Sequence, residues 1–222
     1  MYERRFINDM HFMLREAKRL GVCVYPTRIY NITDLIINHY SKGYYHNLSH
    51  IKDCLRKLKL INEYIETSEI GFLKIYFAII FHDIIYDPTK IDNEINSAEY
   101  WRNTAAILQF SKEFTDDVKE MILATMHTSS SVKNKPLHYQ YLIDIDLSIL
   151  GAKKNKFEDY CNKIRQEYSF VPDSIFNSGR IKILENLLSR CSIYSTEVFH
   201  NKYEKRAIVN LKNEIDRLIK LG

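Results

Sequence analysis

The chain has 222 residues, of which 45% are hydrophobic and 27% are charged, and its formal net charge is +4. These values are typical of one folded globular domain and exclude a disordered or fibrous chain. The basic residues are interleaved with 28 acidic residues and form no run, which argues against nucleic acid as a partner. With only 6 glycines and 4 prolines for tight turns, the sequence predicts a compact all-α fold of roughly eight to ten helices.

No stretch of the sequence has the pattern of a targeting or membrane segment. The first residues lead into a charged amphipathic stretch, and no window approaches about 18 uninterrupted apolar residues. The four cysteines are far apart and form no C-x-x-C pair, so neither a zinc ribbon nor a redox motif is predicted. We therefore expect a soluble cytoplasmic protein with reduced thiols and no membrane partner.

Apolar residues recur at three- and four-residue steps along most of the chain, which indicates amphipathic helices. Helices are predicted over residues 3–20, 27–41, 48–66, 68–86, 92–110, 118–127, 138–150, 153–169, 174–190 and 195–220. The sequence contains no internal repeat and no interdomain linker, so a single domain is predicted over residues 1–222. In this domain we expect the helices of residues 1–43 to pack on a core formed by residues 44–222.

Segment 77–86, in the fourth predicted helix, is apolar or aromatic at eight of its ten positions. A helix of this kind is buried on every side. His82 and Asp83 lie within it, and a buried imidazole and carboxylate are costly unless they have partners. A bound cation satisfies both groups, so this pair predicts a metal site.

Histidine and aspartate residues elsewhere in the chain supply further metal-capable groups. Asn47 is the predicted N-cap of the third helix, which puts His50 in its first turn. The short apolar segment 138–150 contains Asp144 and Asp146, and we interpret it as a buried helix, although a strand has the same pattern. The metal-capable residues are, in chain order, His46, His50, His82, Asp83, His127, Asp144 and Asp146.

Imidazole and carboxylate groups without a thiolate suit a divalent cation. First-row ions such as Mn²⁺, Fe²⁺, Co²⁺ and Ni²⁺ accept this donor set, and Mg²⁺ and Zn²⁺ accept it as well. The expected cofactor is therefore a divalent metal ion, with one or two ions per chain.

Five short motifs resemble those of a known family. They are Tyr-His-Asn-x-x-His over residues 45–50, Phe-His-Asp-x-x-Tyr-Asp-Pro over 81–88, Asn-Glu-x-x-Ser-Ala over 93–98, Asp-x-Asp-Leu-x-Ile-Leu-Gly over 144–151 and Gly-Arg at 179–180. From about residue 44 onward, the chain is similar to a subfamily of predicted phosphohydrolases in the HD-domain superfamily, whose members are metal-dependent. The resemblance implies an HD-type helical domain that hydrolyses a phosphate ester.

Residue by residue, the resemblance implies His50, His82, Asp83 and one further aspartate as metal ligands. We expect Asp146 to be the fourth ligand and keep Asp144 as the alternative. In a helix these two side chains are about 200° apart and cannot both face one ion, whereas in an extended segment they share a face.

Other residues are expected to act on the substrate. Superfamily members with additional histidines often hold a second ion, and His46 and His127 are candidates for that role or for substrate binding. Glu94 is the candidate general base, or the residue that orients the water. Asp83 is expected to be a catalytic residue as well as a metal ligand. Arg180 is expected to bind phosphate, since a guanidinium can do so through two parallel hydrogen bonds.

These assignments have structural alternatives. Glu94 suits the first turn of a helix, where the helix dipole favours an acid, whether or not it acts in catalysis. Arg180 equally suits a structural ion pair. Lys133 and Lys135, in the polar loop before segment 138–150, are weaker candidates for phosphate contact.

The sequence thus predicts an enzyme, a metal-dependent phosphoric ester hydrolase acting on a small phosphorylated metabolite or nucleotide. A bound cation lowers the pKa of water and neutralises charge on the phosphoryl oxygens, while the protein fixes an in-line attack. One alternative is a di-iron oxygenase of the same fold, and another is a non-catalytic nucleotide-binding protein with a structural metal. Both the oligomeric state and the number of ions stay open at this stage.

Overall fold

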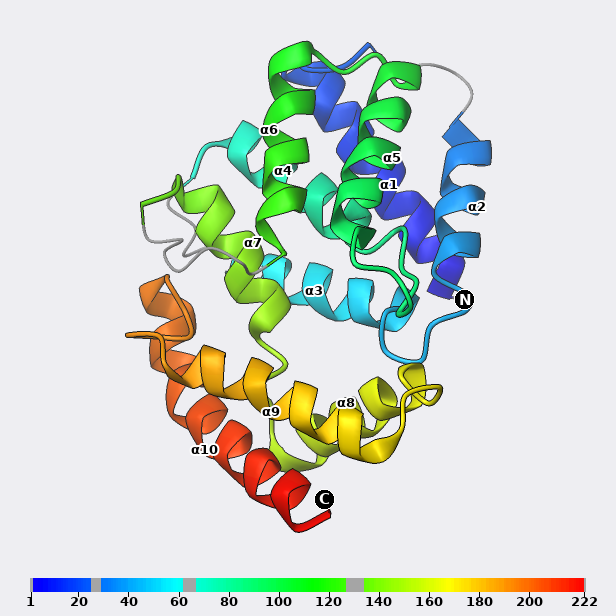
Figure 1. The fold of residues 1–222 in the computed structure, drawn as a ribbon. Helices are drawn as coiled ribbons and strands as arrows, with labels where there is room; N and C mark the ends of the chain where they lie inside the picture. Colours follow the sequence, from blue (N-terminus) through cyan, green and yellow to red (C-terminus); the bar gives the residue numbers. More distant parts are fainter. Residues whose placement is uncertain (1, 25–28, 62–66, 127–133, 222) are drawn as a thin grey trace.

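Ten helices and no β-sheet make up the part of the chain that the computed structural model describes, residues 2–24, 29–61, 67–126 and 134–221 (Figure 1). This confirms the predicted all-α fold. The helices are α1 (Tyr2–Arg19), α2 (Ile29–His39), α3 (Leu48–Ile61), α4 (Glu69–Phe81), α5 (Asn93–Ile107), α6 (Lys112–Ala124), α7 (Leu137–Leu147), α8 (Lys154–Glu167), α9 (Asp173–Leu188) and α10 (Glu197–Leu221). None of these described helices is both long and apolar enough to cross a membrane.

Helix α4 is deeply buried in the core. Residues 75–81 are buried without interruption, and α3, α6 and α7 pack around the helix. Ser68 caps its N-terminus, since the Ser68 hydroxyl accepts a hydrogen bond from the backbone N–H of Gly71. Phe77 of α4 packs against Trp101 of α5, with 5.6 Å between the ring centroids. Helix α4 is apolar on all sides, and other helices therefore pack against it on all sides.

Helix α4 ends at Phe81, whereas the sequence predicted that it continues to residue 86. His82 is the C-cap, and its ring Nδ1 lies 2.9 Å from the carbonyl oxygen of Ile79. The last carbonyls of a helix lack partners within the helix, and this imidazole satisfies one of them. His82 and Asp83 consequently lie in the turn after the helix rather than within it.

Helix α6 begins at Lys112 rather than at residue 118, because the cap lies earlier than the apolar pattern indicates. The hydroxyl of Ser111 accepts a hydrogen bond from the backbone N–H of Phe114. The predicted end of this helix, residue 127, lies outside the described residues.

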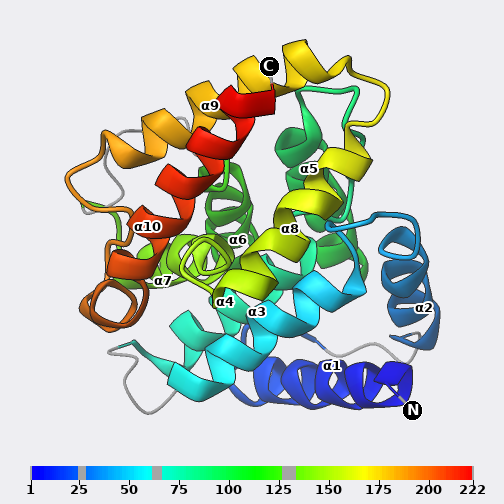
Figure 2. The ribbon, with the colours of Figure 1, turned by 90° about the horizontal axis from the view of Figure 1, so that it is seen from below.

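The helices form two groups that meet around α7. Helices α8, α9 and α10 lie together below the others in Figure 1, and α7 reaches from the upper group into the lower one. Figure 2 shows α8 running beside α3, where Lys156 of α8 forms an ion pair with Asp53 of α3. The start of α3, the end of α4 and the end of α7 are thereby brought to one place between the groups.

Candidate metal centre

Two imidazoles from distant parts of the chain face each other where α3 begins and α4 ends. Asn47 caps α3 through its Oδ1, which accepts a hydrogen bond of 2.8 Å from the backbone N–H of Ser49, and His50 follows in the first turn. The Nε2 atoms of His50 and His82 lie 3.2 Å apart, and both side chains are buried. Two ring nitrogens at this distance require a proton or a cation between their lone pairs.

Two carboxylates approach the same pair of nitrogens. Asp83 Oδ2 lies 3.0 Å from His82 Nε2 and 3.5 Å from His50 Nε2. Asp146 Oδ1, from the end of α7, lies 3.3 Å from His50 Nε2 and 3.6 Å from His82 Nε2. These four residues, His50, His82, Asp83 and Asp146, are called the His-Asp cluster below.

The spacing of three of these atoms, His50 Nε2, His82 Nε2 and Asp83 Oδ2, fits a single cation. With metal–ligand bonds of about 2.1 Å, neighbouring ligand atoms lie about 3.0 Å apart in an octahedron and about 3.4 Å apart in a tetrahedron. The three distances among these atoms are 3.2, 3.0 and 3.5 Å, and Asp146 forms a separate group of metal-ligand spacing with His50 and Cys54. Two neutral imidazoles and two carboxylates also balance the charge of a divalent ion. The His-Asp cluster therefore has the donors to hold a divalent metal ion, and His50, His82 and Asp83 have the spacing.

Hydrogen bonds behind the cluster orient its groups. The Nδ1–H of His82 donates to the carbonyl oxygen of Ile79, which leaves the lone pair of Nε2 facing the cluster, as a metal ligand requires. Behind Asp83, the buried Tyr40 hydroxyl donates a hydrogen bond of 2.7 Å to the carbonyl oxygen of Ile80. Tyr40 thereby ties the segment after α2 to the end of α4.

Asp144 faces away from the cluster, although it is only two residues from Asp146. Its carboxylate accepts hydrogen bonds of 2.6 to 3.1 Å from the backbone N–H groups of Ser195 and Thr196 and from the Thr196 hydroxyl. Burial raises the pKa of Asp144 to about 6, although the hydrogen bonds from Thr196 and Ser195 lower it. Asp144 thus attaches α7 to the start of α10, and Asp146 is the aspartate that the structure places in the cluster.

The charges of the cluster favour one another. Burial alone would raise the pKa of Asp83, but the imidazoles of His82 and His46 hold it below its ordinary value. Burial alone would lower the pKa of His82, but the carboxylates of Asp83 and Asp146 raise it well above its ordinary value. The carboxylates therefore favour positive charge at this point, and a metal ion supplies that charge when it replaces the imidazole protons.

Beside the cluster, His46 and Glu167 form a second pair. Glu167 Oε2 lies 2.7 Å from His46 Nδ1, and Oε1 accepts hydrogen bonds from the backbone N–H groups of Tyr45 and His46 at 2.7 and 2.9 Å. Tyr86 stacks on the His46 ring with 3.8 Å between centroids, and the ring of His50 is 6.1 Å away. Glu167 therefore holds His46 with its proton on Nδ1 and leaves Nε2 as a hydrogen-bond acceptor.

Glu167 is a site residue that reasoning from the sequence missed. It lies 121 residues after His46 and resembles a surface acid of an amphipathic helix, yet its side chain is only 3% exposed. One local signal was available. Glu167 is the last residue of α8, where the helix dipole disfavours a negative charge, and an acid at that position calls for a partner outside the helix.

Three cavities reach the cluster. One of about 770 Å³ has Asp83 and His46 in its wall. A second, of about 510 Å³, is lined by Asp146, His46 and part of α9, and is called the α9 cavity below. A third, of about 280 Å³, is lined by His50 and Asp146. The two larger volumes are in the range of small-molecule binding sites.

Arg180 of α9 lies in the wall of the α9 cavity, as does Asp146. Its Nη2 donates a hydrogen bond of 2.6 Å to the Tyr160 hydroxyl, and its guanidinium carbon is 5.3 Å from the centroid of that ring. Within the described part of the chain it forms no ion pair, and Glu214, whose charge also favours the guanidinium, is bound by Arg217. A half-buried guanidinium without a carboxylate partner is typical of an anion-binding site.

The remaining predicted residues lie outside these cavities or outside the described residues. Glu94 is in the first turn of α5 and lines none of the three cavities at the cluster. This position is the one expected of an acid that the dipole of its helix favours. Lys135 stands over the Tyr139 ring, with 5.6 Å from Nζ to the centroid, and lines none of them either. His127 and Lys133 lie outside the described residues.

Cys54, one turn after His50 on α3, is a further neighbour of the cluster. Its Sγ is 3.8 Å from each ring nitrogen of His50, and together with His50 and Asp146 it forms a second group with metal-ligand spacing. The sequence predicted ligands without a thiolate, because Cys54 belongs to no metal motif. A sulfur donor at this point would favour softer ions such as Zn²⁺ over Mg²⁺.

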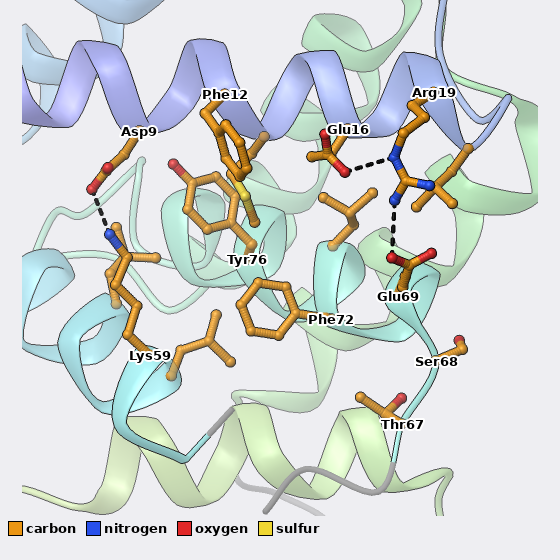
Figure 3. Close-up of a pocket in the computed structure, with 15 residues that line it drawn as sticks. Asp9, Phe12, Glu16, Arg19, Lys59, Thr67, Ser68, Glu69, Phe72 and Tyr76 are labelled. Atoms are coloured by element: carbon orange, nitrogen blue, oxygen red, sulfur yellow. Dashed lines mark hydrogen bonds and ion pairs between the residues drawn. The ribbon is translucent and has the colours of Figure 1, made fainter. Parts of the chain in front are cut away.

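Another cavity, of about 520 Å³, is separate from the metal centre. It lies between α1, the end of α3 and the start of α4, and none of the cluster residues lines it (Figure 3). Phe12 and Phe72 contribute apolar walls, and the ion pair of Arg19 with Glu69 lies at one side. Tyr76 also lines it, and its buried hydroxyl has no hydrogen-bond partner among the described residues.

Comparison of the chain with protein-family models, with curated proteins and with solved structures finds no match. The function of the chain is therefore inferred from the geometry of the His-Asp cluster and the α9 cavity.

Proposed function

We propose that this protein is a metal-dependent phosphohydrolase, in which the His-Asp cluster holds a divalent ion and the α9 cavity binds a phosphate ester. The observation that carries the proposal is that Arg180 and Asp146 line the same cavity. An anion bound to the Arg180 guanidinium therefore lies in the cavity that opens on the cluster. The five motifs that resemble the HD-domain superfamily support the same function.

Each group near the cluster has a task in this reaction. A divalent ion held by the cluster lowers the pKa of water and neutralises charge on the phosphoryl oxygens. Arg180 donates two parallel hydrogen bonds to phosphoryl oxygens, and it loses little freedom because Tyr160 already orients it. His46, whose Nδ1 is bound by Glu167, accepts the proton of the attacking water at Nε2.

This proposal gives the role of general base to His46 instead of Glu94. His46 lines two of the three cavities at the cluster, and Glu94 lines none of them. The stacked ring of Tyr86 and the carboxylate of Glu167 hold the His46 ring in one orientation, as a general base requires.

The test is a screen of the full chain against phosphomonoesters, phosphodiesters and nucleotides in the presence of Mn²⁺, Mg²⁺, Fe²⁺, Co²⁺, Ni²⁺ or Zn²⁺. We expect metal-dependent hydrolysis that His82→Ala abolishes, and an increase in KM of about tenfold in Arg180→Met. His200→Ala is the matched control, since His200 is exposed and contacts Ser192 and Glu204 instead of the cluster.

Two outcomes of this screen contradict the proposal. One is hydrolysis by His82→Ala at the rate of the unchanged protein. The other is a chain that holds two irons, changes its optical spectrum with redox state and hydrolyses none of the substrates, which is the result expected of a di-iron oxygenase.

A further inference from the structure

Three helices supply apolar walls to the cavity of about 520 Å³ beside α1, which is called the α1 cavity below. Phe12 projects from α1 and Phe72 from α4 (Figure 3). Phe72 and Tyr76 are four residues apart and so share one face of α4, and Leu55 and Leu58 of α3 complete the apolar lining. The volume is in the range of small-molecule sites, and three aromatic rings in the wall suit an aromatic ligand.

A buried hydroxyl in this wall lacks a hydrogen-bond partner. Tyr76 is 2% exposed, and its hydroxyl has no partner among the described residues. In Figure 3 its ring projects from α4 toward α1. Tyr40 is buried to the same extent, but its hydroxyl donates to the carbonyl oxygen of Ile80 and it does not line the α1 cavity. A buried hydroxyl without a partner is unfavourable, so a molecule in the α1 cavity that supplies the partner gains affinity.

The Tyr76 hydroxyl is suited to donate this hydrogen bond. Burial and the carboxylate of Asp9 both raise the pKa of Tyr76 well above its ordinary value, so the phenol keeps its proton. A phenol that keeps its proton donates through its O–H. The matching group on the ligand is therefore an acceptor oxygen.

Phe12 gives a ligand access to the hydroxyl. Because the hydroxyl of Tyr76 is buried, a ligand oxygen reaches it only when a side chain of the wall turns aside. Phe12 lines the same cavity and is 52% exposed, so its ring can change rotamer toward solvent without disturbing the core.

The charged side chains among the described residues of this wall are already paired with one another. Arg19 forms ion pairs with Glu16 at 2.8 Å and with Glu69 at 2.9 Å. Lys59 forms an ion pair with Asp9 at 2.8 Å. These five residues are the charged members of the described wall, and three of them are acidic. An anionic ligand would have to compete with these carboxylates for each cation, so the wall favours a neutral ligand.

We propose that the α1 cavity is a binding site for a neutral aromatic molecule that carries an acceptor oxygen, such as a ketone. Its ring packs against Phe72 and the leucines of α3, and its oxygen accepts a hydrogen bond from the Tyr76 hydroxyl. None of the residues of the His-Asp cluster lines this cavity. The site is therefore independent of the proposed phosphohydrolase function.

The test uses two ligands of the same shape, of which one has a carbonyl group where the other has a methylene group. The ketone is 6-fluoro-2-acetylnaphthalene, and the hydrocarbon is 2-ethyl-6-fluoronaphthalene. Titrations of the metal-stripped full chain, followed by ¹⁹F NMR, give both affinities. The ratio of the two affinities is compared between the unchanged protein and Tyr76→Phe. This comparison isolates the hydrogen bond, because the difference in solvation between the two ligands is the same for both proteins.

We expect Tyr76→Phe to lower the ratio of ketone to hydrocarbon affinity by about fivefold, which is typical of one hydrogen bond between neutral groups. Tyr40→Phe is the matched control, since it removes a buried hydroxyl outside the α1 cavity, and it should leave the ratio unchanged. Phe72→Leu should lower both affinities and leave the ratio unchanged, because it removes only apolar contact. The carboxylate 6-fluoro-2-naphthoate should bind about tenfold more weakly than the ketone.

Three outcomes would overturn the proposal. The first is a ratio that Tyr76→Phe leaves unchanged in a variant shown by circular dichroism to be folded. The second is a ketone whose affinity is the same in the unchanged protein, Tyr76→Phe and Phe72→Leu, which would place it elsewhere on the molecule. The third is binding of the carboxylate more tightly than the ketone, which would show that the site selects an anion.

Discussion

The Nε2 atoms of His50 and His82 lie 3.2 Å apart, although 32 residues separate them in the sequence. The contact forms because His50 is in the first turn of α3 and His82 caps the last turn of α4, and these helices pack side by side. Both residues are fixed by the ends of helices, which bring two imidazoles together without a flexible loop. Such fixed positions are what a metal site requires of its ligands.

Substitution of the two aspartates of α7 is predicted to affect different properties, stability for Asp144 and metal affinity for Asp146. In Asp144→Asn, an NH₂ group replaces one of the oxygens that accept from the backbone N–H groups of Ser195 and Thr196, so donors face a donor. We expect the free energy of unfolding to fall by about 2–3 kcal/mol. Asp146→Asn should keep the stability and lose metal affinity. Denaturant unfolding and metal titration of both variants measure the two effects, and a variant pair with equal loss of metal affinity would contradict the assignment.

Glu167→Gln tests the orientation of His46. The glutamine oxygen can still accept from the backbone N–H groups of Tyr45 and His46, but its NH₂ group faces Nδ1 and drives the imidazole proton to Nε2. We expect kcat to fall by about 100-fold while metal content is unchanged. The ¹⁵N chemical shifts of the His46 ring report the tautomer directly, and an unchanged tautomer with reduced kcat would mean that Glu167 acts through the fold alone.

The same variant predicts a dependence of stability on pH. Burial alone would raise the pKa of Glu167, but hydrogen bonds from His46 and Tyr45 lower it below its ordinary value. A depressed pKa gives stability that is present above the unfolded value of about 4.3 and is lost as pH falls through the folded value. The difference in melting temperature between the unchanged protein and Glu167→Gln should therefore shrink as pH falls below about 4. A difference that stays constant there would contradict this assignment.

Two buried tyrosines offer a matched test of hydrogen bonding in the core. Tyr40 donates to the carbonyl oxygen of Ile80, whereas the hydroxyl of Tyr76 has no partner among the described residues, and each tyrosine is 2% exposed. Tyr40→Phe should lose about 1 kcal/mol, and Tyr76→Phe should gain a similar amount because an unsatisfied hydroxyl is removed. Thermal unfolding measures both changes as shifts of about 2–4 °C in opposite directions. Destabilisation by Tyr76→Phe would show that its hydroxyl has a partner.

The sequence predicted the helical fold because apolar periodicity and scarce glycine act locally. It also singled out His82 and Asp83, since two polar groups in an apolar run are costly anywhere in a folded core. The predicted end of α4 was five residues too late. The helix ends where the His82 ring bonds to the carbonyl oxygen of Ile79, and this bond depends on the conformation of one side chain. No pattern of neighbouring residues indicates it.

Contacts between distant helices account for the rest of the site. Glu167 and His46 are 121 residues apart, and nothing in either local sequence specifies that α8 passes beside residue 46. The choice between Asp144 and Asp146 likewise depends on where α10 begins, because Ser195 and Thr196 bind the first of them. Helical periodicity indicated that the two side chains diverge, and only the packing shows which one faces His50.

The most direct test of the metal centre is a titration of the metal-stripped full chain with Mn²⁺ and, separately, Zn²⁺ by isothermal titration calorimetry. We expect one ion per chain in the unchanged protein and in His200→Ala, and a loss of affinity of more than about 100-fold in His50→Ala and in His82→Ala. Circular dichroism verifies that the variants remain helical. Binding of either ion by folded His82→Ala with the affinity of the unchanged protein would contradict the His-Asp cluster as the metal site.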